Sequence, residues 1–330
     1  MDPVPAPARL WLLATGHFLP RCLHVVAELG VADHIDDRPA SLELLARQSG
    51  CDAPTLARML RLLETAGLFQ PVGDGWAHTE LSRYLRSDHP QSMRAFARMI
   101  GGHVQWAALG ELKSAVDTGQ PAIKTVVPGG MWDYFKDHPE EARVFDAAMT
   151  SKSFAEIAAL IPAFDFTRYS RIADIGGGRG HVLAAVLAAA PSASGVLFDL
   201  PHVVKAAPPV PRMEVQGGDF FHDALPHADA YIVSQVLHDW ADDDAVAILR
   251  AVRRAARADS HLLIIEQVLP AAVGPHPAKV LDVVMLTLTG GRERTRDEYA
   301  SLLEAGGFEL EKVVPTTGAV SVLVGVPRQR

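Results

Sequence analysis

The second half of the chain shows a regular alternation of short apolar runs and segments whose apolar residues recur at helical spacing. This pattern predicts strands at 171–175, 195–199, 212–216, 229–234 and 260–267, helices at 180–190, 202–207, 241–258, 278–288 and 295–305, and two closing strands. Strands that alternate with crossover helices indicate an α/β fold with a parallel sheet and helices on both faces. Ligands of such sheets bind at the carboxyl ends of the strands.

The first hundred residues show a different pattern, two short helices followed by a hairpin. Ser41 is placed to cap the first helix, a tight turn follows it, and apolar residues then recur at helical spacing until Gly67. Strand-like residues flank Gly73-Asp74-Gly75. This order predicts a winged helix-turn-helix, whose best-known use is to read DNA.

The charge of this front segment argues against DNA reading. Through residue 100 there are 10 basic and 11 acidic side chains, and the whole chain has a formal net charge of −8 without a basic block. A DNA-reading domain should be clearly basic. We therefore favour a packing or dimerisation module with no nucleic-acid partner, and a winged-helix regulator stays the less favoured alternative.

The middle of the chain is predicted to be helical and is rich in aromatic residues. Its large side chains include Trp106, Trp132, Tyr134, Phe135, Phe145, Met149 and Phe154. Such residues usually form a core, but their density just before the α/β segment makes them candidates for the apolar wall of a pocket for a flat substrate. The chain is long enough for two domains. We predict a front domain at 1–100, a helical linker that contributes to the pocket at 101–165, and a ligand-binding domain at 166–330.

The cysteines and the lengths of the apolar runs indicate the cellular compartment in which the protein is expected. Cys22 and Cys51 are the two cysteines, and neither has the spacing of a disulfide framework or a zinc site. The early apolar run from Leu10 to Ala14 is too short for a signal peptide, and no later run approaches a membrane-spanning length. We expect a cytoplasmic protein with no metal and no membrane partner.

A glycine-rich turn follows the first predicted strand of the α/β segment. Residues 174–180 read Asp-Ile-Gly-Gly-Gly-Arg-Gly, so the glycines are spaced G-x-G-x-G, whereas a dinucleotide site has G-x-G-x-x-G. Glycines allow a ligand to approach main-chain N–H groups closely. A carboxylate at Asp174 would repel a pyrophosphate and attract an ammonium. An amino-acid-bearing nucleoside such as S-adenosylmethionine fits this turn better, although such a turn also occurs where elements simply pack closely.

Polar residues follow the next strands at the same predicted edge. Asp199 lies nineteen residues after Gly180, where a carboxylate accepts hydrogen bonds from ribose hydroxyls. Asp219 and Phe220 offer an acceptor and an aromatic face for adenine. His238 then lies at the rim, where a methyl acceptor would sit, and we interpret it as a base. Two carboxylates from later segments, Glu266 and Glu293, would flank the imidazole and favour one tautomer and its protonated form.

Six motifs, in this order, resemble those of S-adenosylmethionine-dependent O-methyltransferases of the caffeic acid and hydroxyindole type. They are Asp-Ile-Gly-Gly-Gly-Arg-Gly, Phe-Asp-Leu-Pro-His-Val, Gly-Gly-Asp-Phe-Phe, Val-Leu-His-Asp-Trp, Ile-Glu-Gln-Val-Leu-Pro and Gly-Gly-Arg-Glu-Arg-Thr. The likeness covers nearly the whole chain. It implies the class I methyltransferase fold, which has a Rossmann-like, mostly parallel seven-stranded sheet. It also implies an N-terminal, mainly helical winged-helix domain that mediates dimerisation, and therefore a homodimer.

The resemblance also assigns roles by position. The residues implied to hold the cofactor are Asp174, Gly176, Gly177, Gly178, Gly180, Asp199, Leu200, Gly218, Asp219, Phe220, Ser234 and Ser153. The implied catalytic set is His238 as general base, Glu266, Glu293 and Asp239, and the implied acceptor pocket contains Trp132, Phe145, Met149 and Met285. Plant members carry a lysine where this chain has Ser234, so that contact is lost or indirect.

The implied reaction moves a methyl group from S-adenosylmethionine to the hydroxyl of a small aromatic or polyketide-like acceptor and leaves S-adenosylhomocysteine. Apolar and aromatic pocket residues indicate a flat, partly apolar substrate. They do not show whether it is a phenol, an indole, a phenazine or a hydroxylated polyketide. An alternative keeps the fold and the cofactor but has non-methylating chemistry on a polycyclic substrate. The presence of His238, Glu266 and Glu293 favours methyl transfer.

Overall fold

The computed structural model describes residues 4–329, which divide into two compact units. Unit 1 comprises the chain up to residue 107 together with 132–152, and unit 2 comprises 108–131 together with the chain from residue 153 onward. The middle segment therefore contributes to both units. The domain boundaries expected at residues 100 and 165 stay a prediction.

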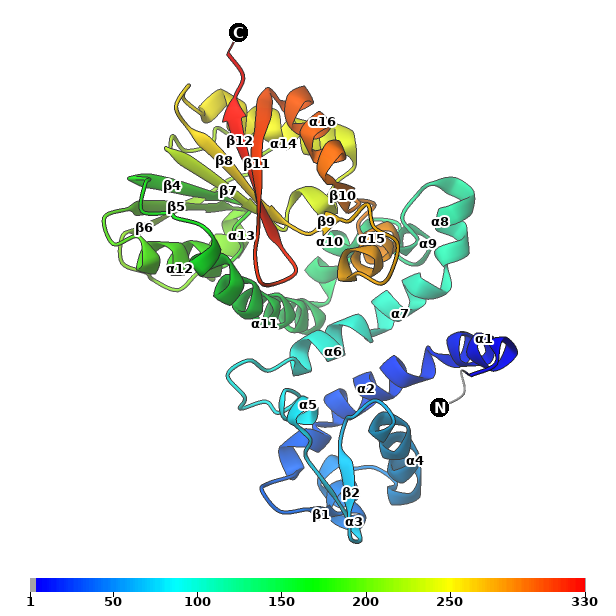
Figure 1. The fold of residues 1–330 in the computed structure, drawn as a ribbon. Coiled ribbons are helices and arrows are strands. Elements are labelled where there is room, and N and C mark those ends of the chain that lie inside the picture. The colour runs from blue at the N-terminus through cyan, green and yellow to red at the C-terminus, as the bar shows by residue number, and fades with distance from the viewer. Residues whose placement is uncertain (1–3, 330) are drawn as a thin grey trace. The chain divides into compact units, whose positions relative to one another are not determined.

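Unit 1 is mainly helical (Figure 1). Its elements are α1 (Ala6–Thr15), α2 (Phe18–Leu29), the 3-10 helix η1 (Val31–His34), β1 (Ala40–Ser41), α3 (Leu42–Ser49), α4 (Ala53–Glu64), β2 (Gln70–Val72), β3 (Gly75–Ala77), α5 (Glu80–Arg83), α6 (Arg94–Ile100), most of α7 (His103–Gly110), most of α10 (Gly130–Asp137) and the first half of α11 (Pro139–Ala163). The small sheet has the order β1-β3-β2.

The predicted winged helix-turn-helix is confirmed in unit 1. The Ser41 side chain accepts a hydrogen bond from the backbone N–H of Leu44 at 3.2 Å and so begins α3. Asp52 caps α4 in the same way through the N–H of Thr55 at 2.9 Å. The apolar face of α4 is fully buried in the core of this unit, and the hairpin β2–β3 follows it.

The N-terminal helices bear on the expectation that no apolar run approaches a membrane-spanning length. The segment Ala6–Leu29, which contains α1 and α2, has 24 residues and is long and apolar enough to cross a membrane by length and composition alone. A mostly buried core helix of a soluble protein and a signal sequence near the N-terminus pass the same test, so this is weak evidence. Within this segment α1 ends at Thr15 and α2 begins at Phe18, so the apolar stretch consists of two helices separated by Gly16 and His17.

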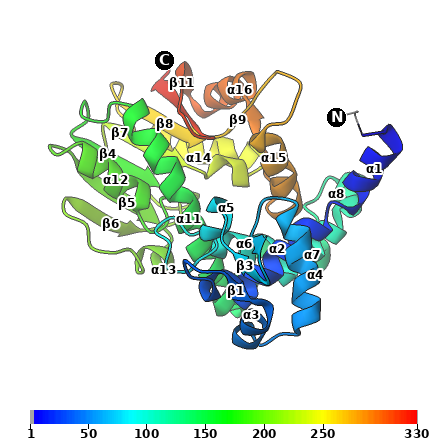
Figure 2. The same cartoon turned by 60° about the horizontal axis from the view of Figure 1, so that its bottom comes forward.

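Unit 2 contains the large sheet and its helices (Figure 2). Its elements are α8 (Leu112–Thr118), α9 (Ile123–Val126), the second half of α11, β4 (Arg171–Ile175), α12 (His181–Ala189), β5 (Ser194–Asp199), α13 (Pro201–Val204), β6 (Met213–Gly217), β7 (Ala230–Ser234), the 3-10 helix η2 (Leu237–Asp239), α14 (Asp242–Ala255), β8 (His261–Glu266), β9 (Val268–Leu269), α15 (Pro277–Leu288), β10 (Arg294–Thr295), α16 (Arg296–Gly306), β11 (Phe308–Pro315) and β12 (Ser321–Pro327).

The sheet has seven strands in the order β11-β12-β8-β7-β4-β5-β6, with β12 antiparallel to both neighbours and the other pairs parallel. Alternate residues of β4 enter two separate cores: Ala173 and Ile175 pack with α14 and α16, whereas Ile172 packs with α11 and α12. The sheet is therefore covered on both faces, as predicted.

The predicted strands and helices of unit 2 agree with the structure to within about two residues, apart from two helices that end three residues early. The helix expected at 241–258 ends at Ala255, and the short helix expected at 202–207 ends at Val204. The sequence did not reveal β9 and β10. These two-residue strands pair in parallel, with Arg294 opposite Val268. This pairing holds the segment before α16, which contains Glu293, beside the chain that follows β8.

Candidate active site

Five parallel strands end at one edge of the large sheet. The pairs Ile175 with Phe198, Asp199 with Gly217 and Ser234 with Ile265 are in register. The segments that follow β4, β5, β6, β7 and β8 therefore start close together. This edge is where an α/β fold binds its ligand.

The turn after β4 requires glycine. Gly176, Gly178 and Gly180 have φ values of +70°, +59° and +80°, which L side chains rarely adopt. A Cβ at Gly176 would lie 2.8 Å from a methyl carbon of Val236, whereas one at Gly178 would meet no atom within 4 Å. The turn is therefore packed against the segment after β7 on one side and open at Gly178, which leaves a cradle for a ligand.

Asp199 lies beside this turn at the end of β5. Its Oδ2 accepts a hydrogen bond from the N–H of Gly178 at 2.8 Å, and Oδ1 accepts from the N–H of Leu200 at 2.7 Å. Burial raises the pKa of Asp199, while these two donors act in the opposite direction. The predicted ribose acceptor is thus held against the glycine turn, and Leu200 next to it is 41% exposed.

Asp174 differs from the expectation that it faces a ligand ammonium. The residue is 0% exposed, and neither carboxyl oxygen has a hydrogen-bond partner. A Cβ at Gly177 would lie 2.5 Å from its carboxyl carbon, so the side chain lies directly beneath the turn. Burial, together with the charge of Asp199, raises the pKa of Asp174 to about 7. The described geometry does not support direct contact with a ligand.

The segment after β6 supplies the predicted adenine partners. Asp219 Oδ1 accepts a hydrogen bond from the N–H of Phe221 at 2.8 Å. The Phe220 ring lies 6.0 Å from the Trp240 ring, edge to face, and is 3.7 Å from where a Cβ of Gly176 would be. Gly218 leaves room for the Phe198 ring, which a Cβ would approach to 2.7 Å. The aromatic face is therefore next to the glycine turn, and the adenine role stays a prediction.

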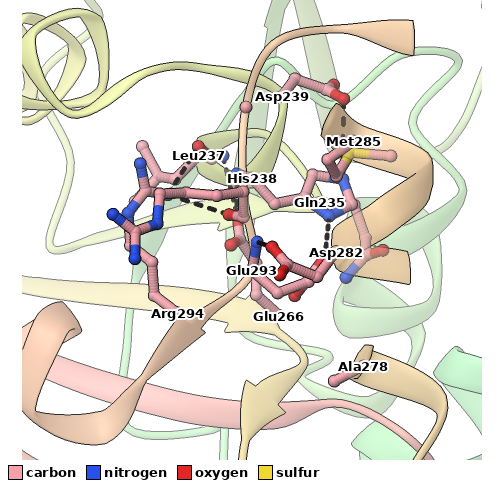
Figure 3. Close-up of polar contacts among 12 residues, drawn as sticks. Gln235, Leu237, His238, Asp239, Glu266, Ala278, Asp282, Met285, Glu293 and Arg294 are labelled. Carbon is pink, nitrogen blue, oxygen red and sulfur yellow. Dashed lines mark hydrogen bonds and ion pairs between the residues drawn. The ribbon is translucent and has the colours of Figure 1, made fainter. Parts of the chain in front are cut away.

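His238 lies in η2, just after β7, and its imidazole is held by Glu293 (Figure 3). Glu293 Oε1 is 2.7 Å from Nδ1, and the two residues are 4% and 0% exposed. Asp239 Oδ1 is 3.9 Å from Nε2. Burial disfavours the charged imidazolium, but Asp239, Glu293 and Glu266 outweigh it and raise the pKa of His238 to about 9. The surrounding carboxylates therefore favour the protonated imidazole over the neutral ring.

Glu266 has a different partner from the one that we expected. Its Oε1 accepts hydrogen bonds from the backbone N–H groups of Val236, Leu237 and His238 at 3.1, 2.7 and 3.3 Å, and Oε2 accepts one from the Tyr299 hydroxyl at 2.5 Å. It holds the backbone that carries the imidazole instead of hydrogen-bonding to the ring. Its charge still favours imidazolium, because it belongs to the same buried cluster.

Three residues near His238 were missed by sequence reasoning. The Arg294 guanidinium is 1% exposed, donates to the carbonyl oxygens of Leu237 and Trp240, and pairs with Asp242. Asp282 Oδ1 accepts from the N–H of Glu293 at 2.9 Å (Figure 3). A Cβ at Gly291 would lie 1.9 Å from the His238 carbonyl oxygen. Arg294 and Gly291 belong to the quoted motif Gly-Gly-Arg-Glu-Arg-Thr, which was the available signal, whereas Asp282 had none.

The expected acceptor residues fall in both units. In unit 1 the Trp132 ring lies edge to face with that of Phe145 at 5.7 Å, and Trp132 is 45% exposed. Met149 also belongs to unit 1. Met285 of unit 2 is buried on α15, and Ser153 and Ser234 are partly buried. Their roles as acceptor and cofactor contacts stay predictions. Among residues 4–329, no group of three or more His, Cys, Asp or Glu side chains could hold a metal ion.

Comparison with known proteins assigns both parts of the chain. Residues 109–309 match the O-methyltransferase domain family, and residues 11–88 match the O-methyltransferase dimerisation domain. The chain is 39% identical to a phenazine O-methyltransferase of Lysobacter antibioticus over 98% of this chain and 97% of that protein. It is 36% identical to a mitomycin biosynthesis 6-O-methyltransferase of Streptomyces lavendulae over 91% and 88%.

A solved structure shows the same similarity at lower sequence identity. Human N-acetylserotonin methyltransferase, in complex with S-adenosylmethionine, superposes with a TM-score of 0.91 at 26% identity over all of both chains. The full-length match includes the front domain as well as the sheet. The similarity is therefore to whole two-domain proteins.

Proposed function

Because this chain belongs to the S-adenosylmethionine-dependent O-methyltransferases that carry an N-terminal dimerisation domain, we propose that His238 is the base that activates its acceptor hydroxyl. The acceptor is a small aromatic secondary metabolite or a biosynthetic precursor of one. Relatives named for phenazine and mitomycin substrates support this class. The observation that carries the proposal is the 2.7 Å contact between Glu293 and Nδ1 of a buried His238.

The residues at the strand edge fit the cofactor. The open side of the turn at Gly178, the carboxylate of Asp199 and the ring of Phe220 supply a cradle, a ribose acceptor and an adenine face in one row. The bound cofactor supplies an electrophilic methyl group on a positively charged sulfur. The protein then has to bring a hydroxyl oxygen in line with that methyl group and remove its proton.

The energetic contributions of base catalysis and of reactant orientation can be compared. A phenol with a pKa near 10 is about three units short of ionisation at neutral pH, which is about 4 kcal/mol. General-base catalysis by His238 typically gives about 10²–10⁴-fold. Orientation of the two reactants supplies roughly 7–11 kcal/mol. Positioning is therefore the larger effect, and Glu293 serves the base by holding Nδ1 so that Nε2 is left for the acceptor.

Two further properties belong to this proposal. The front domain forms a homodimer, which is supported by the dimerisation-domain match and by Leu10, Trp11 and Leu13 of α1, which are 68%, 65% and 78% exposed. Such a run of exposed apolar side chains is expected where a second protein surface covers them. We place the enzyme in the cytoplasm, as expected for an enzyme of small-molecule biosynthesis.

The test is turnover with labelled S-adenosylmethionine and a panel of aromatic hydroxy compounds. We expect labelled methyl ether and S-adenosylhomocysteine in equal amounts. His238→Ala should lower turnover by about 10²–10⁴-fold and still bind cofactor. His227→Gln is the matched control, because His227 bonds the carbonyl of Ala255 and not a site residue. Wild-type turnover in His238→Ala, or consumption of substrate without S-adenosylhomocysteine, would contradict the proposal.

A further inference from the structure

Four acidic groups lie around the buried imidazole of His238. Within unit 2, Glu293 approaches Nδ1 at 2.7 Å, Asp239 approaches Nε2 at 3.9 Å, and Glu266 accepts the residue's own N–H at 3.3 Å. Asp282 of α15 is next, bonded to the N–H of Glu293. In a buried site, this many carboxylates strongly favour a nearby positive charge.

The other groups that face His238 do not cancel this charge. Arg294 of β10 donates to the Leu237 carbonyl, but its charge is paired with Asp242 at 2.7 Å. Tyr299 of α16 is neutral and donates to Glu266. The cluster therefore favours one cation, and in the resting enzyme the proton on His238 supplies it, consistent with a pKa raised to about 9. An imidazolium cannot accept a second proton, so the resting residue is not yet a base.

The cofactor carries a positive charge on sulfur, and the proposed function requires its methyl group to lie near the acceptor hydroxyl that His238 serves. The glycine turn contacts the His238 segment directly, because a Cβ at Gly176 would lie 2.8 Å from the side chain of Val236, two residues before His238. Like charges in a buried site strongly disfavour each other. On the basis of the proposed function, we propose that His238 holds a proton in the resting enzyme and releases it when S-adenosylmethionine binds, so that cofactor binding itself converts the residue into a base.

The proton balance of the full cycle then closes. Neutral His238 takes the acceptor's hydroxyl proton while the acceptor oxygen forms its bond to the methyl carbon and the carbon–sulfur bond breaks. The sulfur of the product is neutral, so the positive charge is back on the imidazole. His238 releases that proton to solvent when the next cofactor binds. One positive charge therefore lies near the carboxylate cluster at each stage, on the sulfur before transfer and on the imidazole after it. The same acidic groups stabilise both arrangements.

The experiment counts protons released on binding, by calorimetry at pH 7 in two buffers of different ionisation enthalpy. We expect about one proton released per S-adenosylmethionine and about none per S-adenosylhomocysteine, because the two differ in the charge on sulfur. Between pH 6 and 8, the affinity for S-adenosylmethionine should rise about tenfold per pH unit and that for S-adenosylhomocysteine should stay nearly constant. Equal proton counts for the two ligands would overturn the proposal.

Variants identify the source of the proton. His238→Gln should bind S-adenosylmethionine with almost no proton release, whereas His227→Gln should behave as the wild type. Asp174, buried beneath the glycine turn, is the other nearby acid that could release a proton, and Asp174→Asn should retain most of the release. Release that persists in His238→Gln would overturn the proposal. If S-adenosylmethionine does not bind at all, the proposed function itself fails, and the two failures are distinguishable.

Discussion

The hydroxyl of Tyr299 donates a hydrogen bond to Oε2 of Glu266 across 2.5 Å, and both residues are 0% exposed. The other oxygen of Glu266 accepts three consecutive backbone N–H groups at the start of the His238 segment. One buried carboxylate therefore connects α16 to the loop that carries the base. The position of the imidazole depends on this connection as well as on Glu293.

Tyr299→Phe should weaken this connection, because it removes the hydroxyl and keeps the aromatic ring. It leaves one buried carboxylate oxygen without its donor, which costs about 1–3 kcal/mol of the free energy of unfolding. Turnover should also fall, by severalfold, because the loop is held less firmly. Urea denaturation and kcat measure the two effects. Tyr231→Phe is the control, since the Tyr231 hydroxyl accepts from the N–H of Ala228, away from the site. It should lose stability only, and an equal loss of kcat in both variants would contradict the argument.

Glu293→Gln tests the charge next to His238 separately from the contact. Glutamine can still accept a hydrogen bond from Nδ1, so the tautomer is kept, but the negative charge is lost. The pKa of His238, raised to about 9 by its carboxylates and despite burial, should fall. We expect turnover to drop about 10–100-fold, as part of the general-base contribution. Titration of the imidazole C–H resonances measures the shift, with Glu298→Gln, which alters a helix cap, as control. An unchanged midpoint would contradict this reading.

Asp174→Asn should stabilise the protein at neutral pH. Burial and Asp199 raise the pKa of Asp174 to about 7. The folded state then binds more protons than the unfolded state between about pH 4 and 7, so wild-type stability falls as pH rises through that window. The amide cannot ionise and avoids that loss. We expect Asp174→Asn to gain a few kcal/mol relative to wild type at pH 8, up to about 4, and much less at pH 5.

The control for this prediction has the opposite sign. Asp229 is partly buried, but hydrogen bonds from Arg257 and from the backbone N–H groups of Ser170 and Arg171 lower its pKa. Its charge therefore contributes stability above the unfolded pKa, and this contribution is lost as pH falls. Asp229→Asn should destabilise the protein at pH 8. Thermal melts of both variants across pH test the pair, and a loss of stability in Asp174→Asn at pH 8 would contradict the assignment.

The sequence predicted the strand edge well because local pattern determines it. The ends of β4, β5 and β7 follow from short apolar runs, that of β6 from an alternating segment, and all are marked by the polar or glycine residues at or after them; parallel pairing then brings them together. His238 and Glu293 were predicted as partners and are in contact although 55 residues apart. That pairing came from the family resemblance as well as from position.

Burial and backbone partners were not predictable in the same way. Asp174 was expected to face a ligand, because the sequence shows a carboxylate beside a turn and not which side of the turn it occupies. Glu266 was expected at the imidazole, because a carboxylate at a strand end has no visible preference between a side chain and three N–H groups 28 to 30 residues away. The position of Arg294 depends on the β9–β10 pairing, and two-residue strands leave no periodic signal.

Gly291 gives the most direct test of how closely the base must be held. Its φ is not in the left-handed region, so an added Cβ meets crowding and not backbone strain. That Cβ would lie 1.9 Å from the His238 carbonyl oxygen and 2.4 and 2.6 Å from backbone atoms of Asp239 and Trp240. Backbone cannot rotate away as a side chain can, so Gly291→Ala has to displace the loop. We expect a stability loss of about 1–3 kcal/mol and a kcat loss of at least tenfold.

Gly50→Ala separates loss of stability from loss of position. Gly50 ends α3 with φ +65° and has no atom within 4 Å of a Cβ, so alanine there costs strain of about 1 kcal/mol far from the chemistry. It should lower the melting temperature and leave kcat unchanged. Both variants are assayed well below their melting temperatures, with cofactor binding measured in parallel to establish that each is folded. If Gly291→Ala retains wild-type turnover, close packing of residues 238–240 is not needed for catalysis, and the base works from a looser position than the structure shows.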